Sequence, residues 1–316
     1  NFGTKAETLE KLNGKLMNAR VLPQFRFTVN QWKELGPALF EGSKEQWLYE
    51  PVIVRSSGVS EDTVNESLAG HFKSVGNVLG FENIFGAIET VAASYGDGLA
   101  TNQIFIQPML TDVKVSGVLF TKDINTGAPY IVINYDEDTG AVDTVTSGKG
   151  DSLKTFYHAK SMNYICPKGC LKDWKGRLIS TAGQLERLFN CDSLDVEFAI
   201  NKHNDLIILQ VRHLVDKSEV KCDLDDHREL LSRITNKVES LSKPHPYLHG
   251  DRSVFGVMPD WNPAEIIGLH PNPMALSLYK ELITDNIWAY QRSNYGYRDL
   301  RSFSLMISFC GLPYID

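Results

Sequence analysis

A short β-branched run that leads directly into an arginine is the feature that most constrains how this chain folds. The run covers residues 52–54, and Arg55 and two serines follow it. β-Branched residues favour a buried strand, so the permanent charge of Arg55 is expected to reach into a cleft at the strand end. The planar guanidinium suits phosphate oxygens, and small residues after it would let backbone N–H groups approach a polyphosphate. The alternative is an arginine in an ordinary ion pair.

A second pattern places four polar side chains on one face of a predicted hairpin. Residues 194–212 contain two apolar β-forming runs separated by a polar, turn-rich segment. Because side chains alternate along a strand, Asp195 and Glu197 share a face, as do Gln210 and Arg212 on the partner strand. Such a face is costly to bury without ligands, and Mg²⁺ prefers carboxylate plus phosphate oxygens. The alternative is an exposed face with two weak salt bridges.

Several motifs, in a fixed order along the chain, resemble the ATP-grasp domain of the phosphoenolpyruvate-utilising dikinases. This family includes phosphoenolpyruvate synthase, pyruvate phosphate dikinase and rifampin phosphotransferase. The motifs are VRSS, SLAGHF, VSGVLFTKDINTG, and LDVEFAI followed by LIILQVR. The resemblance covers roughly residues 1–215. It implies an α+β fold in which a two-lobed ATP-grasp nucleotide-binding domain holds ATP and Mg²⁺, followed by a mostly helical, truncated second domain.

The resemblance implies a role for each residue that matches a family motif. Residues 2–6, FGTKA, stand where the family has a glycine-rich loop, so Lys5 corresponds to the ATP-binding lysine. Phe2 and Thr4 depart from that pattern, and we expect a less open loop. Arg55 and Arg212 correspond to the catalytic arginines that hold the ATP phosphates. The other expected ATP ligands are Gly70 and Ser74 at the phosphates, Gln107 at the adenine, and Glu197 and Gln210 at the metal and phosphates.

The sequence divides into four predicted segments. Residues 1–101 and 102–215 are the N-terminal and C-terminal lobes of the ATP-grasp domain, residues 216–245 form a linker helix, and residues 246–316 are part of an acceptor-substrate domain. Residues 141–158 are expected to form a mobile lid, with a solvated loop as the alternative.

The predicted acceptor domain combines a Pro-bounded turn with a long helix over residues 274–292. Asp260, Asn262, Glu265 and Arg298 are its candidate substrate residues, because an amino-acid acceptor needs both anionic and cationic partners. The alternative is that Asn262 simply caps a helix that starts at the next residue, a proline.

The opening FGTKAETL and the later motif MPDWNPAEIIG are similar to those of phosphoenolpyruvate-synthase-like proteins of surface-polysaccharide clusters, including the capsular L-glutamine kinases. This similarity implies that ATP phosphorylates a carrier histidine, which then passes the phosphoryl group to an acceptor such as the L-glutamine amide nitrogen. No histidine here has the G-x-x-[ST]-H context of that carrier, so we expect it on a swivelling domain of the same full-length protein. The alternatives are a true phosphoenolpyruvate synthase (pyruvate, water dikinase), with pyruvate as acceptor, and a non-catalytic ATP-sensing module.

Charge and hydropathy exclude two classes of partner. The net charge is −7 and the pI is about 5.7, which argues against nucleic acid as a main partner. No apolar run approaches the roughly 18 residues of a membrane span, and we expect no signal peptide. We therefore expect a cytoplasmic protein, although the chain begins at Asn1 without a methionine.

Overall fold

The computed structural model divides into two compact units, Asn1–Leu224 and Asp225–Asp316. Each unit mixes helices and strands, so the predicted α+β class is confirmed. None of the helices that the structure describes has the length and apolar character needed to span a bilayer. The residues described are 2–58, 73–96, 101–138, 153–162, 173–214, 222–246, 250–257, 263–299 and 304–315.

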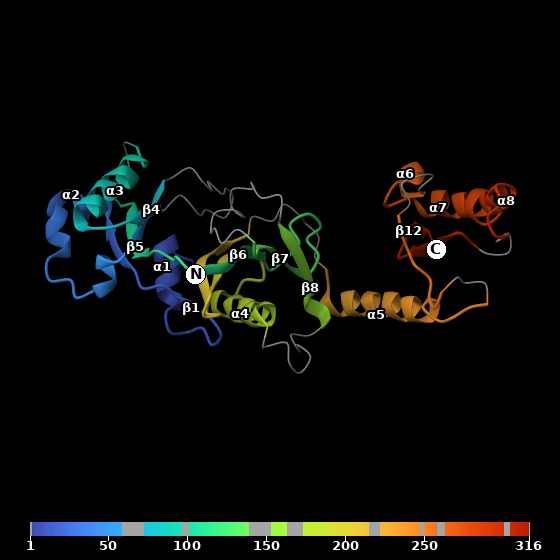
Figure 1. The fold of residues 1–316 in the computed structure, drawn as a ribbon, viewed down its shortest axis with the longest axis horizontal. Helices are drawn as coiled ribbons and strands as arrows, with labels where there is room; N and C mark the ends of the chain where they lie inside the picture. Colours follow the sequence, from blue (N-terminus) through green and yellow to red (C-terminus); the bar gives the residue numbers. More distant parts are fainter. Residues whose placement is uncertain are drawn as a thin grey trace. The chain divides into compact units, whose positions relative to one another are not determined.

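One lobe of the first unit is a four-stranded antiparallel sheet covered by two helices (Figure 1). Trp32 of one helix and Ile84 and Ile88 of the other are buried in the core of this lobe. In the helix that contains Ile84 and Ile88, the buried apolar residues recur three and four positions apart and form one stripe along the helix. In sheet order the strands are β2 (Phe25–Thr28), β5 (Gln103–Pro108), β3 (Val52–Ser57) and β4 (Ser74–Val78), and the helices are α2 (Val29–Leu35) and α3 (Phe81–Ala93).

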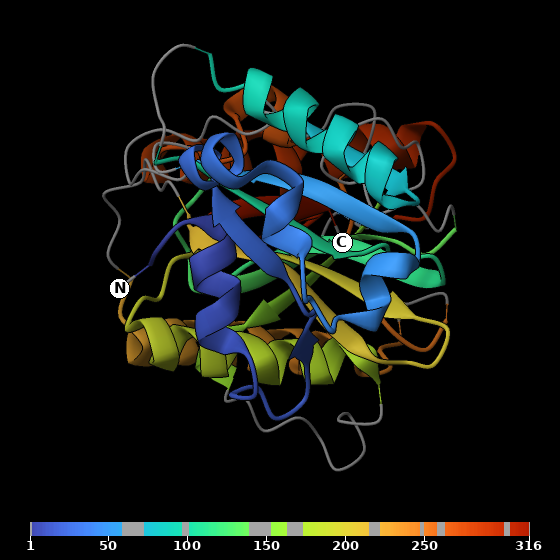
Figure 2. The ribbon, with the colours of Figure 1, turned by 90° about the vertical axis from the view of Figure 1, so that its left-hand side faces the viewer.

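The other lobe is a six-stranded sheet with its own core. One blue and one yellow-green helix lie on this sheet (Figure 2). Leu9 and Leu12 of the first and Leu178 and Leu185 of the second are buried in that core. In sheet order the strands are β1 (Arg20–Val21), β10 (Leu206–His213), β9 (Leu194–Asn201), β6 (Val113–Phe120), β7 (Tyr130–Asp136) and β8 (Lys154–Ala159). Among the described strands of this sheet, only β1 and β10 pair in parallel. The helices are α1 (Lys5–Leu12) and α4 (Trp174–Phe189).

The chain crosses between the lobes more often than the sequence predicts. β5 pairs with β2 and β3, so the strand after residue 102 belongs to the four-stranded sheet and not to the second lobe. Its residues 104–106 are fully buried because the strand is central in that sheet. Conversely, α1 packs on the six-stranded sheet through Ala6, Leu9 and Leu12. The predicted lobe boundary at residue 102 therefore does not match the strand pairing, because β5 follows that residue and still belongs to the four-stranded sheet.

The predicted lid is only partly loop-like in the structure. Its last residues form β8, which pairs with β7 from Tyr130 to Tyr135 and extends the sheet by one edge strand. Backbone hydrogen bonds to a neighbouring strand hold that part in the sheet, so a lid over residues 153–158 is wrong. Residues 139–152, which include the rest of the predicted lid, lie outside the described residues.

The second unit is mostly helical, as predicted. The linker helix is present as α5 (Leu224–Leu241), and Leu231, Ile234 and Val238 are half-buried on it. A continuous helix over residues 274–292 is wrong, because a π-helical turn and a break at residues 285–286 interrupt it. The other elements are α6 (Pro263–Ile267), α7 (Pro273–Tyr279), the π-helical turn η5 (Lys280–Thr284), α8 (Ile287–Asn294), and the paired strands β11 (Met306–Phe309) and β12 (Leu312–Ile315).

Candidate functional site

Arg55 extends from the four-stranded sheet to the hairpin of the other lobe. Its Nη1 donates a hydrogen bond to the carbonyl oxygen of Leu209 at 3.3 Å. Its Nη2 lies 3.9 Å from Oε2 of Glu197, and only 17% of its side chain is exposed. The guanidinium also lies 5.5 Å from the centre of the Phe105 ring. The cation is thus held at the junction of the two lobes by one long ion pair and one long hydrogen bond.

The hairpin that Arg55 reaches has the predicted geometry. β9 and β10 are antiparallel, with Glu197 opposite Gln210 and Asp195 opposite Arg212. An irregularity in the register just before Gln210 sets these pairs. Directly opposed residues share a face, so the prediction that all four side chains lie together is confirmed.

Arg212 is fixed on that face by Asp195. Its Nε and Nη2 atoms lie 2.8 and 2.6 Å from Oδ2 of Asp195, and both side chains are largely buried. The sequence left a salt bridge open as the alternative to a ligand site on this face, and Asp195 and Arg212 do form one. It also fixes the orientation of the guanidinium fork, which is the condition for directed phosphate binding.

Gln210 carries a buried polar atom that calls for a partner. The residue is 3% exposed, and its Nε2 has no hydrogen-bond partner among the described residues. A buried amide N–H without an acceptor costs about 1–3 kcal/mol, so a ligand oxygen at this position would recover that energy. Glu197, on the opposite strand, keeps 19% of its side chain exposed.

Glu197 and Gln210 are the residues that decide whether Mg²⁺ fits the site. The described residues contain no group of three or more His, Cys, Asp or Glu side chains able to hold a metal ion. Mg²⁺ commonly takes one or two carboxylates and completes its shell with water and substrate phosphates. Glu197 and the amide oxygen of Gln210 fit that mode of binding, with the phosphates of a nucleotide as the other ligands.

The start of α1 is closed rather than open, as expected from Thr4. Thr4 caps the helix, and it forms a reciprocal capping box with Glu7. The backbone N–H of Ala6 donates to Oγ of Ser57 at 3.0 Å. These amide groups are bonded within the protein, so they do not form an open backbone cradle for phosphate. The role of Lys5 in binding ATP stays a prediction.

A polar network beside this cap joins the two lobes, and we did not predict it from the sequence. Nε2 of Gln103 donates to Oε1 of Glu7 at 2.8 Å, and Oγ1 of Thr4 donates to Oε1 of Gln103 at 2.9 Å. The hydrogen bond from Gln103 is the main reason that the pKa of Glu7 lies below its ordinary value. The spacing T-x-x-E in the sequence is the one signal that could have indicated the cap.

Three further predicted ATP ligands have less defined positions. Ser74 is the cross-strand partner of Arg55, so the two side chains share a face of the sheet. Gln107 is 1% exposed on β5, opposite Ile53. Gly70 lies outside the described residues.

The predicted acceptor residues are not brought together by the described structure. Asp260 and Asn262 lie outside the described residues. Glu265 is exposed on α6 and takes part in no ion pair within the described part of the chain, and Arg298 is exposed after α8. An acceptor site at these residues stays a prediction.

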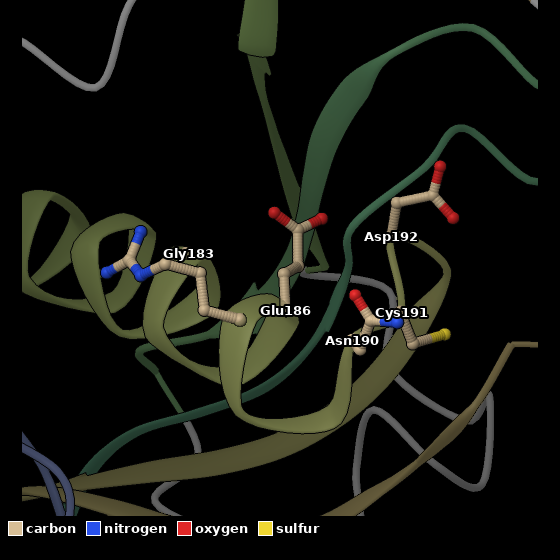
Figure 3. A pocket seen from close by; sticks show the side chains of 6 residues that line it. Gly183, Glu186, Asn190, Cys191 and Asp192 are labelled. Carbon is tan, nitrogen blue, oxygen red and sulfur yellow. The ribbon is translucent and has the colours of Figure 1, made fainter.

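A separate cavity of about 390 Å³ lies at the C-terminal end of α4 and contains none of the predicted residues (Figure 3). Glu186 in its wall pairs with Lys160, which also donates to the carbonyl oxygen of Asp192 at 3.1 Å. Burial raises the pKa of the Cys191 thiol. The carboxylate is neutralised and the thiol stays protonated, so we assign no chemistry to this cavity.

The comparison with protein families gives one match. Residues 30–102 match the family described as pyruvate phosphate dikinase, AMP/ATP-binding domain. The matched segment contains Arg55, Gly70 and Ser74, whereas Lys5 and Gln107 lie outside it. The match supports ATP binding and an ATP-dependent reaction. No curated protein matches the chain.

Solved structures of several ligases are similar to the chain at low identity. The D-alanine-D-alanine ligase from Helicobacter pylori is 10% identical with a TM-score of 0.38, and the match covers 67% of this chain and 51% of the ligase. The L-amino acid ligase from Bacillus licheniformis is 12% identical with a TM-score of 0.39, and the match covers 68% of this chain and 43% of the ligase. The chain thus spans about half the length of these structures, and we draw no functional conclusion from scores this low.

Proposed function

We propose that this chain is the ATP-binding part of a phosphotransferase that works by a dikinase mechanism. The observation that carries the proposal is the arrangement at the lobe junction, where Arg55 from one lobe meets Glu197 and the Leu209 carbonyl of the other, and Gln210 lies opposite Glu197. The family match to an AMP/ATP-binding domain supports the same ligand. A cation, a carboxylate and an unsatisfied amide donor at one junction are the groups that a metal-bound polyphosphate requires.

Each of these side chains has a defined task in this proposal. Arg55 and Arg212 hold phosphate oxygens and stabilise charge that develops during phosphoryl transfer. The 3.3 Å bond from Arg55 to the Leu209 carbonyl is long, so a phosphate can replace it without a large penalty. Nε2 of Gln210 donates to a phosphate oxygen, and Lys5 adds a further cation. Mg²⁺, held by Glu197, supplies charge neutralisation when bound.

The remaining steps of the proposal involve parts beyond this chain. In this mechanism ATP transfers its βγ-pyrophosphoryl group to a carrier histidine on a swivelling domain, and AMP leaves. Water then releases the outer group as phosphate, and the remaining phosphohistidine passes its phosphoryl group to an acceptor, which regenerates the free histidine. We propose L-glutamine as that acceptor, in capsule biosynthesis, with pyruvate as the alternative. An enzyme of this kind works where ATP is available, which supports a cytoplasmic location.

The test is calorimetric titration of the chain with Mg·ATP. We expect saturable binding, and Arg55→Ala should weaken it by about tenfold or more, because a lost charge-assisted hydrogen bond is worth about 1.5–3 kcal/mol. Arg20→Ala is the matched control, since Arg20 forms an exposed ion pair with Asp205. That variant should bind like the wild type.

Two outcomes would refute parts of the proposal. No binding of Mg·ATP by a well-folded chain would remove the nucleotide site altogether. Steady production of AMP by this chain alone would contradict a mechanism that needs a carrier histidine elsewhere. Isotope exchange between ATP and AMP in the full-length protein separates the enzyme from an ATP-sensing module, because a sensor catalyses no exchange.

A further inference from the structure

A second cavity, of about 470 Å³, lies wholly within the second unit. Residues of α5, α7, the π-helical turn and the segment around β11 form its walls. Its volume falls in the range of about 300–1,000 Å³ that is usual for small-molecule sites. None of the residues proposed to bind ATP contributes to it, because they all belong to the first unit.

The charge of the cavity wall is positive. Among the described residues that line it, Lys237 and Lys280 carry charge and no Asp or Glu is present. Asp285 contacts the lining residue Ser304 through a hydrogen bond, but Asp285 does not itself line the cavity. An anionic ligand is therefore favoured, since a ligand cation would meet no counter-charge among the described residues of the wall.

Lys237 is held in place by the protein. Its Nζ donates to the carbonyl oxygen of Ser308 at 2.7 Å and lies 5.5 Å from the centre of the Phe309 ring. An ammonium group has three N–H donors, so this single bond leaves capacity for a ligand oxygen. A positioned cation loses less rotamer entropy on binding than a mobile one.

The rest of the wall is largely apolar. A ligand with an aliphatic body would bury that body here at about 25 cal/mol per Å² of apolar surface, whereas a bare inorganic anion would leave it unused. The apolar lining residues are Leu241, Pro273, Leu276, Met306 and Ile307.

We propose that this cavity binds a small organic carboxylate with an aliphatic body and no cationic group. The carboxylate lies between Lys237 and Lys280, and the aliphatic body packs on the apolar wall. This inference goes beyond the proposed function and does not depend on it, because no ATP-binding residue takes part.

Butyrate is the probe for this site, and butylammonium is its control with the same body and the opposite charge. Calorimetry on the whole chain should show saturable binding of butyrate and none of butylammonium. Lys280→Met should weaken butyrate binding by about tenfold, since one charged partner is lost. Lys243→Met removes an exposed lysine of the same unit that does not line the cavity, and it should leave binding unchanged.

The same samples distinguish this inference from the proposed function. Mg·ATP titrations should be identical for the wild type and Lys280→Met, and a failure to bind ATP would concern only the proposed function. Absence of butyrate binding, binding unaffected by Lys280→Met, or inorganic phosphate binding more tightly than butyrate would each overturn the carboxylate site. Lys280 is exposed, so Lys280→Met is expected to fold; equal melting temperatures check this.

Discussion

Glu197 lies beside two polar residues at the lobe junction. Removing its charge distinguishes a Mg²⁺ ligand from a member of a structural ion pair. Gln210 is its cross-strand partner and Arg55 lies 3.9 Å away. Glu197→Gln keeps the shape and removes the charge, so the Mg²⁺ dependence of ATP binding should largely disappear. The melting temperature without nucleotide should change little, because a long, partly exposed ion pair stabilises by less than about 1 kcal/mol. Titrations with and without Mg²⁺ measure the first effect, and thermal unfolding the second.

Glu10→Gln is the matched control for that experiment. Glu10 pairs with Arg26 at 2.8 Å, and 60% of the Glu10 side chain is exposed. Its loss should change neither Mg²⁺ dependence nor affinity. A Glu197→Gln variant that binds Mg·ATP normally but melts much earlier would assign Glu197 to a structural ion pair instead.

Among the elements, β6 depends on a glycine at its centre. A Cβ at Gly117 would lie 2.9 Å from the ring of Phe198 and would collide with the carbonyl oxygen of Asn134 on the other neighbouring strand. Backbone cannot move away cheaply inside a six-stranded sheet, so Gly117→Ala should destabilise the chain by about 1–3 kcal/mol or more. Urea unfolding at constant temperature measures the change.

Gly86 provides the opposite case on α3. Nothing lies within 4 Å of a Cβ built there, and the residue is exposed inside a helix. Gly86→Ala should therefore stabilise by up to about 1 kcal/mol, through helix propensity. Equal effects at both glycines would show that the close approach across β6 does not constrain the sheet.

The sequence predicts a strand well where polar and apolar side chains alternate strictly along it. The hairpin of β9 and β10 is confirmed because strict alternation sets both the strands and their shared polar face. The sheet to which β5 belongs is not predictable in the same way, since a run buried on both faces carries no directional pattern. The π-helical turn at Lys280–Thr284 is missed because its residues continue a helical pattern, and tertiary packing sets the local winding.

At the scale of the candidate site, types of side chain are predictable and their partners are not. Arg55 is recognised from the β-branched run before it, although β3 continues through Arg55 to Ser57. Its contact with Leu209 joins residues 154 positions apart. The contact between Thr4 and Gln103 is similar, with 99 positions between the residues. Such contacts depend on how the two sheets face each other, which local patterns do not encode.

For the whole molecule, the two units should respond differently to nucleotide. If ATP binds at the lobe junction, amides of β3, β9 and β10 should gain protection from hydrogen exchange, because a ligand stabilises the state that it binds. Amides of α7 and α8 should exchange at the same rate with and without Mg·ATP. Mass spectrometry of peptic peptides resolves these segments, and protection confined to the second unit would contradict the proposed site.

Acid should destabilise both units through buried histidines. Burial lowers the pKa of His158 on β8 and of His227 on α5 below the ordinary value of 6.5. The unfolded chain therefore binds more protons as the pH falls below about 6.5, so the free energy of unfolding is highest above that pH and decreases as the pH falls through the folded-state pKa. Glu7, whose pKa is also lowered, adds a similar loss only below its ordinary value of 4.5.

Urea unfolding between about pH 7.5 and about pH 5 isolates the histidines from the carboxylates. The free energy of unfolding should fall across this range in the wild type. His227→Gln, which replaces a side chain in a residue only 6% exposed, should reduce that slope for the second unit. His270→Gln changes an exposed residue of the same unit and should leave the slope as it is. A slope that persists unchanged in His227→Gln would mean that His227 does not couple proton binding to the folding of this unit.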